Sequence, residues 1–320
     1  MTPRLPGHRL HERFRVLRTL GQGAMGAVYL VEDEKLQGSQ WALKELRVPE
    51  LPSHEQDLAE VLFRREAEIL GGIIHPGVPR LIDFLESTDG CLSLVMEWIN
   101  GTALDEILES LHRPLKAAEA IPIALMVTQV LERLHQQNPP VVFRDLKPSN
   151  LMISQSGRVY FIDFGIARHF QSGRAKDTQE LGTPGFCAPE QYGHGQSSAA
   201  SDIYAVGTTL FHLLSTQDPQ SFNFNFPKLS TLINVSPGVE SAVERCLQLQ
   251  PKDRFASATA LRHDLEKAWE DMPRDPPGAT QGLLLYGLNQ HPLGARKASG
   301  EARQVWKKYL LNTFSLWRSR

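Results

Sequence analysis

The stretch VVFRDLKPSN, residues 141–150, places charged and polar side chains directly after an apolar run. These side chains are Arg144, Asp145, Lys147 and Asn150. Charged groups that are buried without partners destabilise a protein strongly, so their position needs an explanation. The stretch predicts a loop that carries chemistry, a loop that has lost its chemistry, or a polar turn after a strand.

The composition of the whole chain is that of a globular protein. Of 320 residues, 41% are hydrophobic and 22% are charged, which allows one large or two ordinary domains with a substantial core. The net charge of −2 gives no reason to expect a nucleic-acid-binding protein. The three cysteines lie far apart, so their spacing predicts neither a metal site nor a disulfide framework, as in a reducing cytosol.

The N-terminus and the apolar runs bear on location. Residues 1–14, MTPRLPGHRLHERF, lack the apolar core of a signal peptide. No apolar run approaches the ~18 residues that a membrane span needs, and LLLYGL at 283–288 is far too short. A soluble, cytoplasmic protein is therefore expected.

Alternating apolar and polar positions predict a β-rich region at the start of the chain. Residues 14–48 alternate around a glycine cluster, and further strands are expected at 79–86 and 91–97. Between them, a capping box at 53–56 (SHEQ) predicts the start of a helix that ends near Leu70.

From about residue 104 the pattern becomes helical. The clearest helix is expected at 120–135, and helices are expected to dominate 200–270. Strands followed by helices predict an α+β, bilobal fold, with a small antiparallel β lobe and a larger, mainly helical lobe. The predicted parts are an N-terminal extension (1–13), the small lobe (about 14–99), the large lobe (about 100–270), and a linker with a basic tail (271–320).

Lys44 lies among apolar neighbours in WALKEL, residues 41–46. A lysine that extends from a strand edge into solvent is the ordinary interpretation. The following helix favours another, because a carboxylate inside an apolar helix face needs a cation. That face is the i, i+4 stripe Leu58, Leu62, Glu66 and Leu70. We therefore predict that Lys44 pairs with Glu66, and that Glu68 forms an exposed ion pair with the arginines one turn before it.

Three glycines at 21, 23 and 26 in GQGAMGAVYL lie between two predicted strands. Glycines allow sharp turns and let backbone N–H groups approach phosphate oxygens. A glycine-rich hairpin without a ligand is the alternative. Because the pattern continues into a strand and not into a helix, it disfavours a dinucleotide-binding fingerprint.

Five motifs resemble, in order and rough spacing, the signature set of protein kinases: GQGAMGAV, WALK, FRDLKPSN, DFG and APE. Residues from about 14 to 270 resemble a eukaryotic-type serine/threonine protein kinase domain, similar to bacterial members of that family. The resemblance implies an enzyme that uses ATP and Mg²⁺, or Mn²⁺, to phosphorylate Ser and Thr hydroxyls of proteins, with autophosphorylation.

The resemblance also implies catalytic roles for individual residues. Asp145 would orient the substrate hydroxyl and accept its proton, and Lys147 would neutralise charge on the moving γ-phosphoryl group. Asn150 and Asp163 would hold the metal ion. A local turn or cap is the alternative for any one of these residues.

The nucleotide-binding residues are implied in the same way. Lys44, fixed by Glu66, would hold the α- and β-phosphates. Backbone groups at the hinge would meet adenine, and two apolar side chains would flank it. The full set is Gly21, Gln22, Gly23, Ala24, Met25, Gly26, Val28, Ala42, Lys44, Met96, Glu97 and Ile99.

Phe143 stands where this family usually has histidine. The resemblance implies that it packs on Phe164, in an apolar spine with Leu70 and Leu81. Phenylalanine loses the hydrogen bonds of histidine, worth about 1 kcal/mol each, so we expect the change to be tolerated.

The segment from Asp163 to Glu190 resembles an activation segment. Arg144 would meet a phosphorylated residue there, with Ser172 and Thr178 as candidates; both could equally be ordinary loop residues. Thr183 is expected to bond Asp145 or Lys147 instead.

The resemblance also implies a buried pair between Glu190 and Arg254, and Asp202 as an anchor of the 141–150 loop. The resemblance thus implies regulatory roles for Arg144, Ser172 and Thr178, and structural roles for Glu190, Arg254 and Asp202.

Two regions depart from the pattern. Prolines and alternating phenylalanines make a regular helix doubtful at 218–233, so an irregular segment packed on the large lobe is expected.

The tail at 296–320 holds seven Lys/Arg and one Glu, so the rest of the chain has a net charge of −8. Its aromatic residues at helical spacing predict contact with a membrane surface, with a partner, or with the acidic domain itself.

Two other functions share the fold. A pseudokinase would bind nucleotide or partners without turnover, but binding alone would not require all five of Lys44, Glu66, Asp145, Asn150 and Asp163. A small-molecule kinase would not need the full segment ending in APE, residues 188–190.

Overall fold

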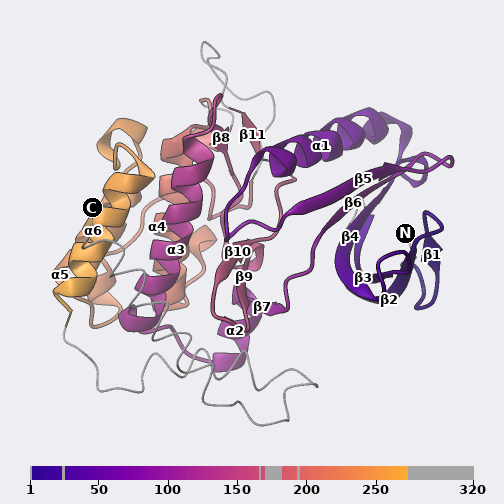
Figure 1. Ribbon diagram of the computed structural model, residues 1–320. Helices are drawn as coiled ribbons and strands as arrows, with labels where there is room; N and C mark the ends of the chain where they lie inside the picture. Colours follow the sequence, from indigo (N-terminus) through magenta and orange to yellow (C-terminus); the bar gives the residue numbers. More distant parts are fainter. Residues whose placement is uncertain (1, 24–25, 166, 170–181, 193–194, 273–320) are drawn as a thin grey trace, which may run out of the picture.

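A curled, six-stranded antiparallel sheet and one long helix form the small lobe (Figure 1). The strand order is β1-β2-β3-β4-β6-β5. The elements are β1 (Arg9–Leu10), β2 (Phe14–Gln22), β3 (Gly26–Asp33), β4 (Ser39–Arg47), α1 (Ser53–Gly72), β5 (Leu81–Glu86) and β6 (Cys91–Glu97). This is a computed structural model, and it describes residues 2–23, 26–165, 167–169, 182–192 and 195–272.

Helix α1 starts as the sequence predicts but for a different reason. Pro52 is the N-cap, and no side chain caps the helix. Proline fixes φ before the first turn, which leaves Ser53 already inside the helix, so its hydroxyl cannot act as a cap. The expected capping box was therefore wrong.

The buried face of α1 is shifted from the predicted stripe. Glu66 is buried as expected, together with Ala59, Phe63 and Leu70. Leu58 is 40% exposed, because the buried stripe follows the 3.6-residue period and drifts off a strict i, i+4 row. Arg64, one of the arginines expected to pair with Glu68, instead forms ion pairs with Glu60 and Glu86.

The large lobe is mainly helical and is built around α4, which is buried along almost its whole length. Its helices are α2 (Leu104–Leu111), α3 (Ala117–His135), α4 (Ala199–Ser215), α5 (Pro237–Cys246) and α6 (Ala258–Glu270). Two small sheets face the small lobe: β7 (Gly101–Ala103), β9 (Leu151–Ser154) and β10 (Val159–Phe161) form one, and β8 (Val141–Val142) pairs with β11 (Arg168–His169). Figure 1 shows these strands between α3 and the small lobe.

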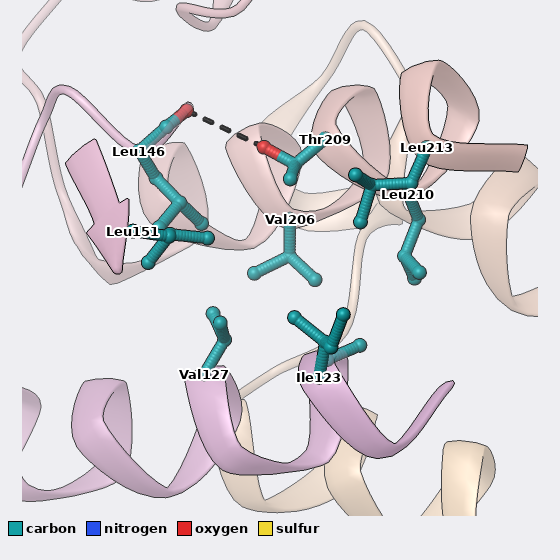
Figure 2. Close-up of a pocket in the computed structure, with 9 residues that line it drawn as sticks. Ile123, Val127, Leu146, Leu151, Val206, Thr209, Leu210 and Leu213 are labelled. Atoms are coloured by element: carbon teal, nitrogen blue, oxygen red, sulfur yellow. Dashed lines mark hydrogen bonds between the residues drawn. The ribbon is translucent and has the colours of Figure 1, made fainter. Parts of the chain in front are cut away.

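A small apolar cavity lies under the 141–150 loop, between α3 and α4 (Figure 2). Leu146 and Leu151 line it from above, and Thr209 Oγ1 donates to Leu146 O at 3.5 Å. Apart from Thr209 the lining is apolar, so the cavity cannot hold a phosphate group and forms part of the packing that supports the loop.

The segment after α4 is irregular, as the sequence predicts. Two short 3₁₀ turns, Pro219–Phe222 and Leu229–Thr231, replace a regular helix. Phe222 and Phe226 pack on Phe211 of α4, with ring centroids 5.4 and 5.0 Å away. Within the described part of the chain, no helix combines the length and apolar character needed to cross a membrane.

Candidate active site

Lys44 on β4 and Glu66 on α1 form the ion pair that the sequence predicts. Lys44 Nζ lies 2.8 Å from both carboxylate oxygens of Glu66. The Glu66 side chain is 3% exposed and that of Lys44 26% exposed. Burial disfavours the charge on Lys44, but Glu66 and Asp163 outweigh it and raise the pKa of Lys44 above its ordinary value. The ammonium group therefore stays charged and faces the space between the lobes.

Asp163 follows β10 and reaches the same ammonium group. Its Oδ1 lies 3.1 Å from Lys44 Nζ and accepts a bond from Gly165 N at 3.0 Å. Burial alone would raise the pKa of Asp163, but the charge of Lys44, the Gly165 bond and the charge of Lys147 lower it. The carboxylate remains 49% exposed, so it is ionised and open to a ligand.

The 141–150 loop brings three further predicted residues together. Asn150 Nδ2 donates to both Oδ2 and the backbone oxygen of Asp145, each at 2.8 Å. Lys147 Nζ lies 3.1 Å from Asp145 Oδ2. Ile162 N also donates to Asn150 O at 3.1 Å. This backbone bond joins the loop to the strand end that carries Asp163.

Thr183 bonds both charged groups of the loop. Its Oγ1 donates to Asp145 Oδ1 at 2.7 Å and accepts from Lys147 Nζ at 2.5 Å. The expectation named one of the two partners, and the structure has both. Asp145 thus holds a threonine hydroxyl on one oxygen, which shows that its carboxylate is accessible to such a group.

The backbone of the loop is anchored from α4. Asp202, which is fully buried, accepts bonds from Phe143 N (2.9 Å) and Arg144 N (2.8 Å). His135 was not predicted from the sequence to take part, and its Nε2 lies 2.8 Å from Asp202 Oδ2. The available signal was that His135 ends the helix that precedes the 141–150 loop, close to where Asp202 is expected to anchor it. These bonds hold Arg144 at φ +76, an uncommon conformation for a non-glycine residue.

Phe143 packs as the resemblance implies. Its ring is fully buried and meets the edges of Phe164 (5.1 Å between centroids) and Phe161 (4.7 Å). Leu70 belongs to the same core and Leu81 packs against it. Dispersion and burial in this aromatic group occupy the space that a histidine would fill.

Most of the residues expected around a nucleotide lie on β2, β3, β4 and β6. Gly21 and Gln22 end β2, Gly23 N donates to Gly26 O, and Ala24 and Met25 lie outside the described residues. Val28 is paired in register with Lys44, and Ala42 with Met96. Gly26 packs so closely on Glu45 O that a Cβ would lie 1.9 Å from it, so only glycine fits there. Glu97 ends β6, and Ile99 follows it between the lobes.

The regulatory candidates are only partly described. Ser172 and Thr178 lie outside the described residues. Arg144 is 3% exposed, and its Nε donates to Ser197 Oγ at 3.2 Å, a contact that the sequence did not indicate.

The pair between Glu190 and Arg254 is present and buried. Arg254 Nη1 and Nη2 bind the two carboxylate oxygens at 2.7 and 2.9 Å. Ser201 Oγ also donates to Glu190, at 2.7 Å. The pair joins the APE motif to the loop before α6, and none of these contacts involves Asp145, Lys147 or Asn150.

Asn150 and Asp163 suit a divalent cation. Asn150 uses its nitrogen on Asp145, which leaves its amide oxygen for a cation, and carboxylate and amide oxygens are the ligands that Mg²⁺ prefers. Among the described residues, no three His, Cys, Asp or Glu side chains cluster as a metal site. A cation at this position would thus need further oxygen ligands, such as phosphate oxygens.

A curled sheet lobe on a helical lobe, with a lysine and two carboxylates between them, defines a class of nucleotide-dependent phosphotransferases. Comparison with protein families then gives the particular family. Residues 14–265 match the model described as "Protein kinase domain", and the chain belongs to the protein kinase family.

Several bacterial kinases are similar over most of the chain. Over 91% of its own length, this chain is 34% identical to serine/threonine-protein kinase pkn2 of Myxococcus xanthus. Over 83% of its own length, it is 35% identical to serine/threonine-protein kinase PrkC of Bacillus subtilis. The chain spans 36% and 42% of the lengths of these two relatives. The structure superposes on the kinase domain of PknI from Mycobacterium tuberculosis with a TM-score of 0.66 and 26% identity, over 84% of this chain and all of that domain.

Proposed function

We propose that this chain is an ATP-dependent serine/threonine protein kinase. The observation that carries the proposal is the set of three contacts on Asp145: a threonine hydroxyl on one oxygen, and the Asn150 amide and Lys147 ammonium on the other. The relatives named as serine/threonine-protein kinases support this activity.

The reaction would proceed by direct transfer. The oxygen of a substrate Ser or Thr forms a bond to the γ-phosphorus as the bond from that phosphorus to the β,γ-bridging oxygen breaks. Asp145 receives the hydroxyl proton, in the place where it now accepts the Thr183 hydrogen bond. Lys147 offsets the charge that develops on the transferred group.

The chain's own residues would position the nucleotide. Lys44, held by Glu66, would bind the α- and β-phosphates, and Val28 and Ala42, on neighbouring strands, would flank the adenine. Asn150 and Asp163 would hold Mg²⁺, with Mn²⁺ as a substitute, and the bound ion would offset phosphate charge. We further propose a cytoplasmic location, supported by three unpaired, buried cysteines at 91, 187 and 246, and protein substrates but no nucleic acid.

Regulation forms part of the proposal. Phosphorylation at Thr178 or Ser172 would place a dianion near Arg144 and order the segment after Asp163. The basic tail would bind the acidic domain, a partner or an anionic membrane surface. Mass spectrometry after incubation with ATP tests the first point, and sedimentation with anionic liposomes tests the membrane option.

A radiolabelled ATP assay on protein and small-molecule acceptors tests the function. We expect incorporation into Ser and Thr of proteins that Asp145→Asn lowers by at least about 100-fold. Incorporation only into small molecules would indicate a small-molecule kinase. Nucleotide binding without any incorporation would indicate a pseudokinase.

A further inference from the structure

The N-terminal strap, residues 2–13, lies against the face of the small-lobe sheet opposite the active site. Figure 1 shows the N-terminus beside β3 and β4. Leu10 belongs to the buried cluster on that face, with Phe14, Tyr29 and Leu43. Gly7 N donates to Val16 O and Val16 N to His8 O. The strap is therefore an ordered part of the lobe and not a loose extension.

Strand β4 connects this outer face to the active site. Successive side chains of a strand point to opposite faces, so Lys44 faces Glu66 while Glu45 and Arg47 face outwards. Glu45 is nevertheless only 2% exposed and Arg47 only 5% exposed at their side chains. Charges buried on the outer face of a sheet need partners.

Two of those partners come from the first residues of the strap. The Arg4 guanidinium bonds the Glu45 carboxylate at 2.9 and 3.2 Å, and Arg4 N donates to Tyr29 Oη at 3.0 Å. Arg47 binds Glu45 at 2.9 Å and donates to the backbone oxygen of Thr2, also at 2.9 Å. The strap thus closes a charged network around the residue that follows Lys44 in the chain.

The strap also reaches the strand on the other side of β4. His11 Nε2 lies 2.9 Å from Oγ of Ser93, a buried residue of β6 that is paired in register with Glu45. Contacts on β3, β4 and β6 together fix β4 from its outer side. Because Lys44 and Glu45 share a peptide bond, a displacement of Glu45 displaces Lys44 as well.

We propose that Arg4 is a positioning residue for nucleotide binding, which it supports by clamping Glu45 and so holding Lys44 in place on the opposite face of β4. The inference rests on the proposed function, in which Lys44 holds the phosphates. It assigns to residues 2–4 a role in ATP affinity although they lie on the far side of the sheet.

The test compares four variants of the full chain by ATP affinity with Mg²⁺ present and by kcat. Arg4→Ala should raise the Kd for ATP by roughly 3- to 10-fold, because a charged hydrogen-bonded contact is lost and part of that loss reaches Lys44. Its kcat at saturating ATP should stay within about twofold, since Lys44 keeps its charge and its pair with Glu66, and Asp145 and Lys147 lie in the other lobe. Arg4→Lys should restore most of the affinity.

Arg9→Ala is the matched control, because Arg9 lies on the same strap but is 66% exposed and pairs with Glu34 at the surface. It should leave the Kd for ATP unchanged. A lower melting temperature for Arg4→Ala with an unchanged Kd would overturn the proposal, as would equal weakening by Arg4→Ala and Arg9→Ala. Lys44→Met separates the two claims: if it weakens ATP binding and Arg4→Ala does not, only the role of the strap fails, and if Lys44→Met leaves both the Kd for ATP and kcat unchanged, the phosphate-binding role that the proposed function gives to Lys44 fails.

Discussion

Two ion pairs in this protein, Arg254–Glu190 and Lys44–Glu66, differ in whether their cation is exposed to a ligand. All five N–H groups of Arg254 are bonded, two to Glu190 and three to backbone oxygens of residues 200, 248 and 249, and its side chain is fully buried. Lys44 is 26% exposed and shares its ammonium with the half-exposed Asp163. A pair closed on all sides can only hold the fold together, whereas a pair with an open side can also bind a ligand.

The largest effect is expected at the closed pair. Arg254→Met should lower the free energy of unfolding by about 3–5 kcal/mol, because Glu190 is left buried without its cation. Denaturant unfolding measures the change. Lys252→Met, at an exposed position two residues away, should change stability by less than about 0.5 kcal/mol. Equal stability of Arg254→Met and the wild type would remove the distinction between the two pairs.

The open pair should respond in activity. Lys44→Met should slow phosphoryl transfer by about 100-fold, equivalent to about 2.7 kcal/mol in the barrier, because phosphate positioning is lost. Its loss of stability should be smaller than that of Arg254→Met, since Glu66 can take up a proton: burial raises the pKa of Glu66 above its ordinary value. Lys35→Met, at an exposed lysine of the same lobe, should behave as the wild type. Full activity of Lys44→Met would show that the pair is purely structural.

The smallest effect is a pH dependence at Asp163. Burial would raise the pKa of Asp163, but Lys44 lowers it below 3.8. A lowered pKa stabilises the fold above pH 3.8, and that contribution is lost as the pH falls through the folded-state pKa. The stability difference between wild type and Asp163→Asn should therefore be constant above about pH 4 and shrink below it. It should stay under about 1 kcal/mol, because solvent screens a half-exposed carboxylate. A difference that grows on acidification would contradict the assignment.

The sequence predicted the contacts that depend on local periodicity or on family motifs. The pair of Lys44 with Glu66 follows from a charge inside a helix face, and α1 does bury Glu66. The pairs of Glu190 with Arg254 and of Thr183 with Asp145 were implied by motif positions. The two-lobed architecture followed from strands giving way to helices.

The remaining features depend on tertiary contacts that have no local signal. Arg4 and Glu45 are 41 residues apart, and nothing near either residue indicates that they meet. Ser197 meets Arg144 across 53 residues for the same reason. The capping box failed locally, because SHEQ fits the motif but Pro52 takes the capping position. Sequence patterns therefore predict an element more reliably than the partners of its outward residues.

The role of Asp145 as proton acceptor is tested most directly by measuring nucleotide binding and phosphoryl transfer separately in Asp145→Asn. Isothermal titration with ATP and Mg²⁺ gives the affinity, and single-turnover incorporation of labelled phosphate gives the rate. We expect an affinity within about threefold of the wild type and a rate at least about 100-fold lower. Transfer by Asp145→Asn at the wild-type rate would contradict this role.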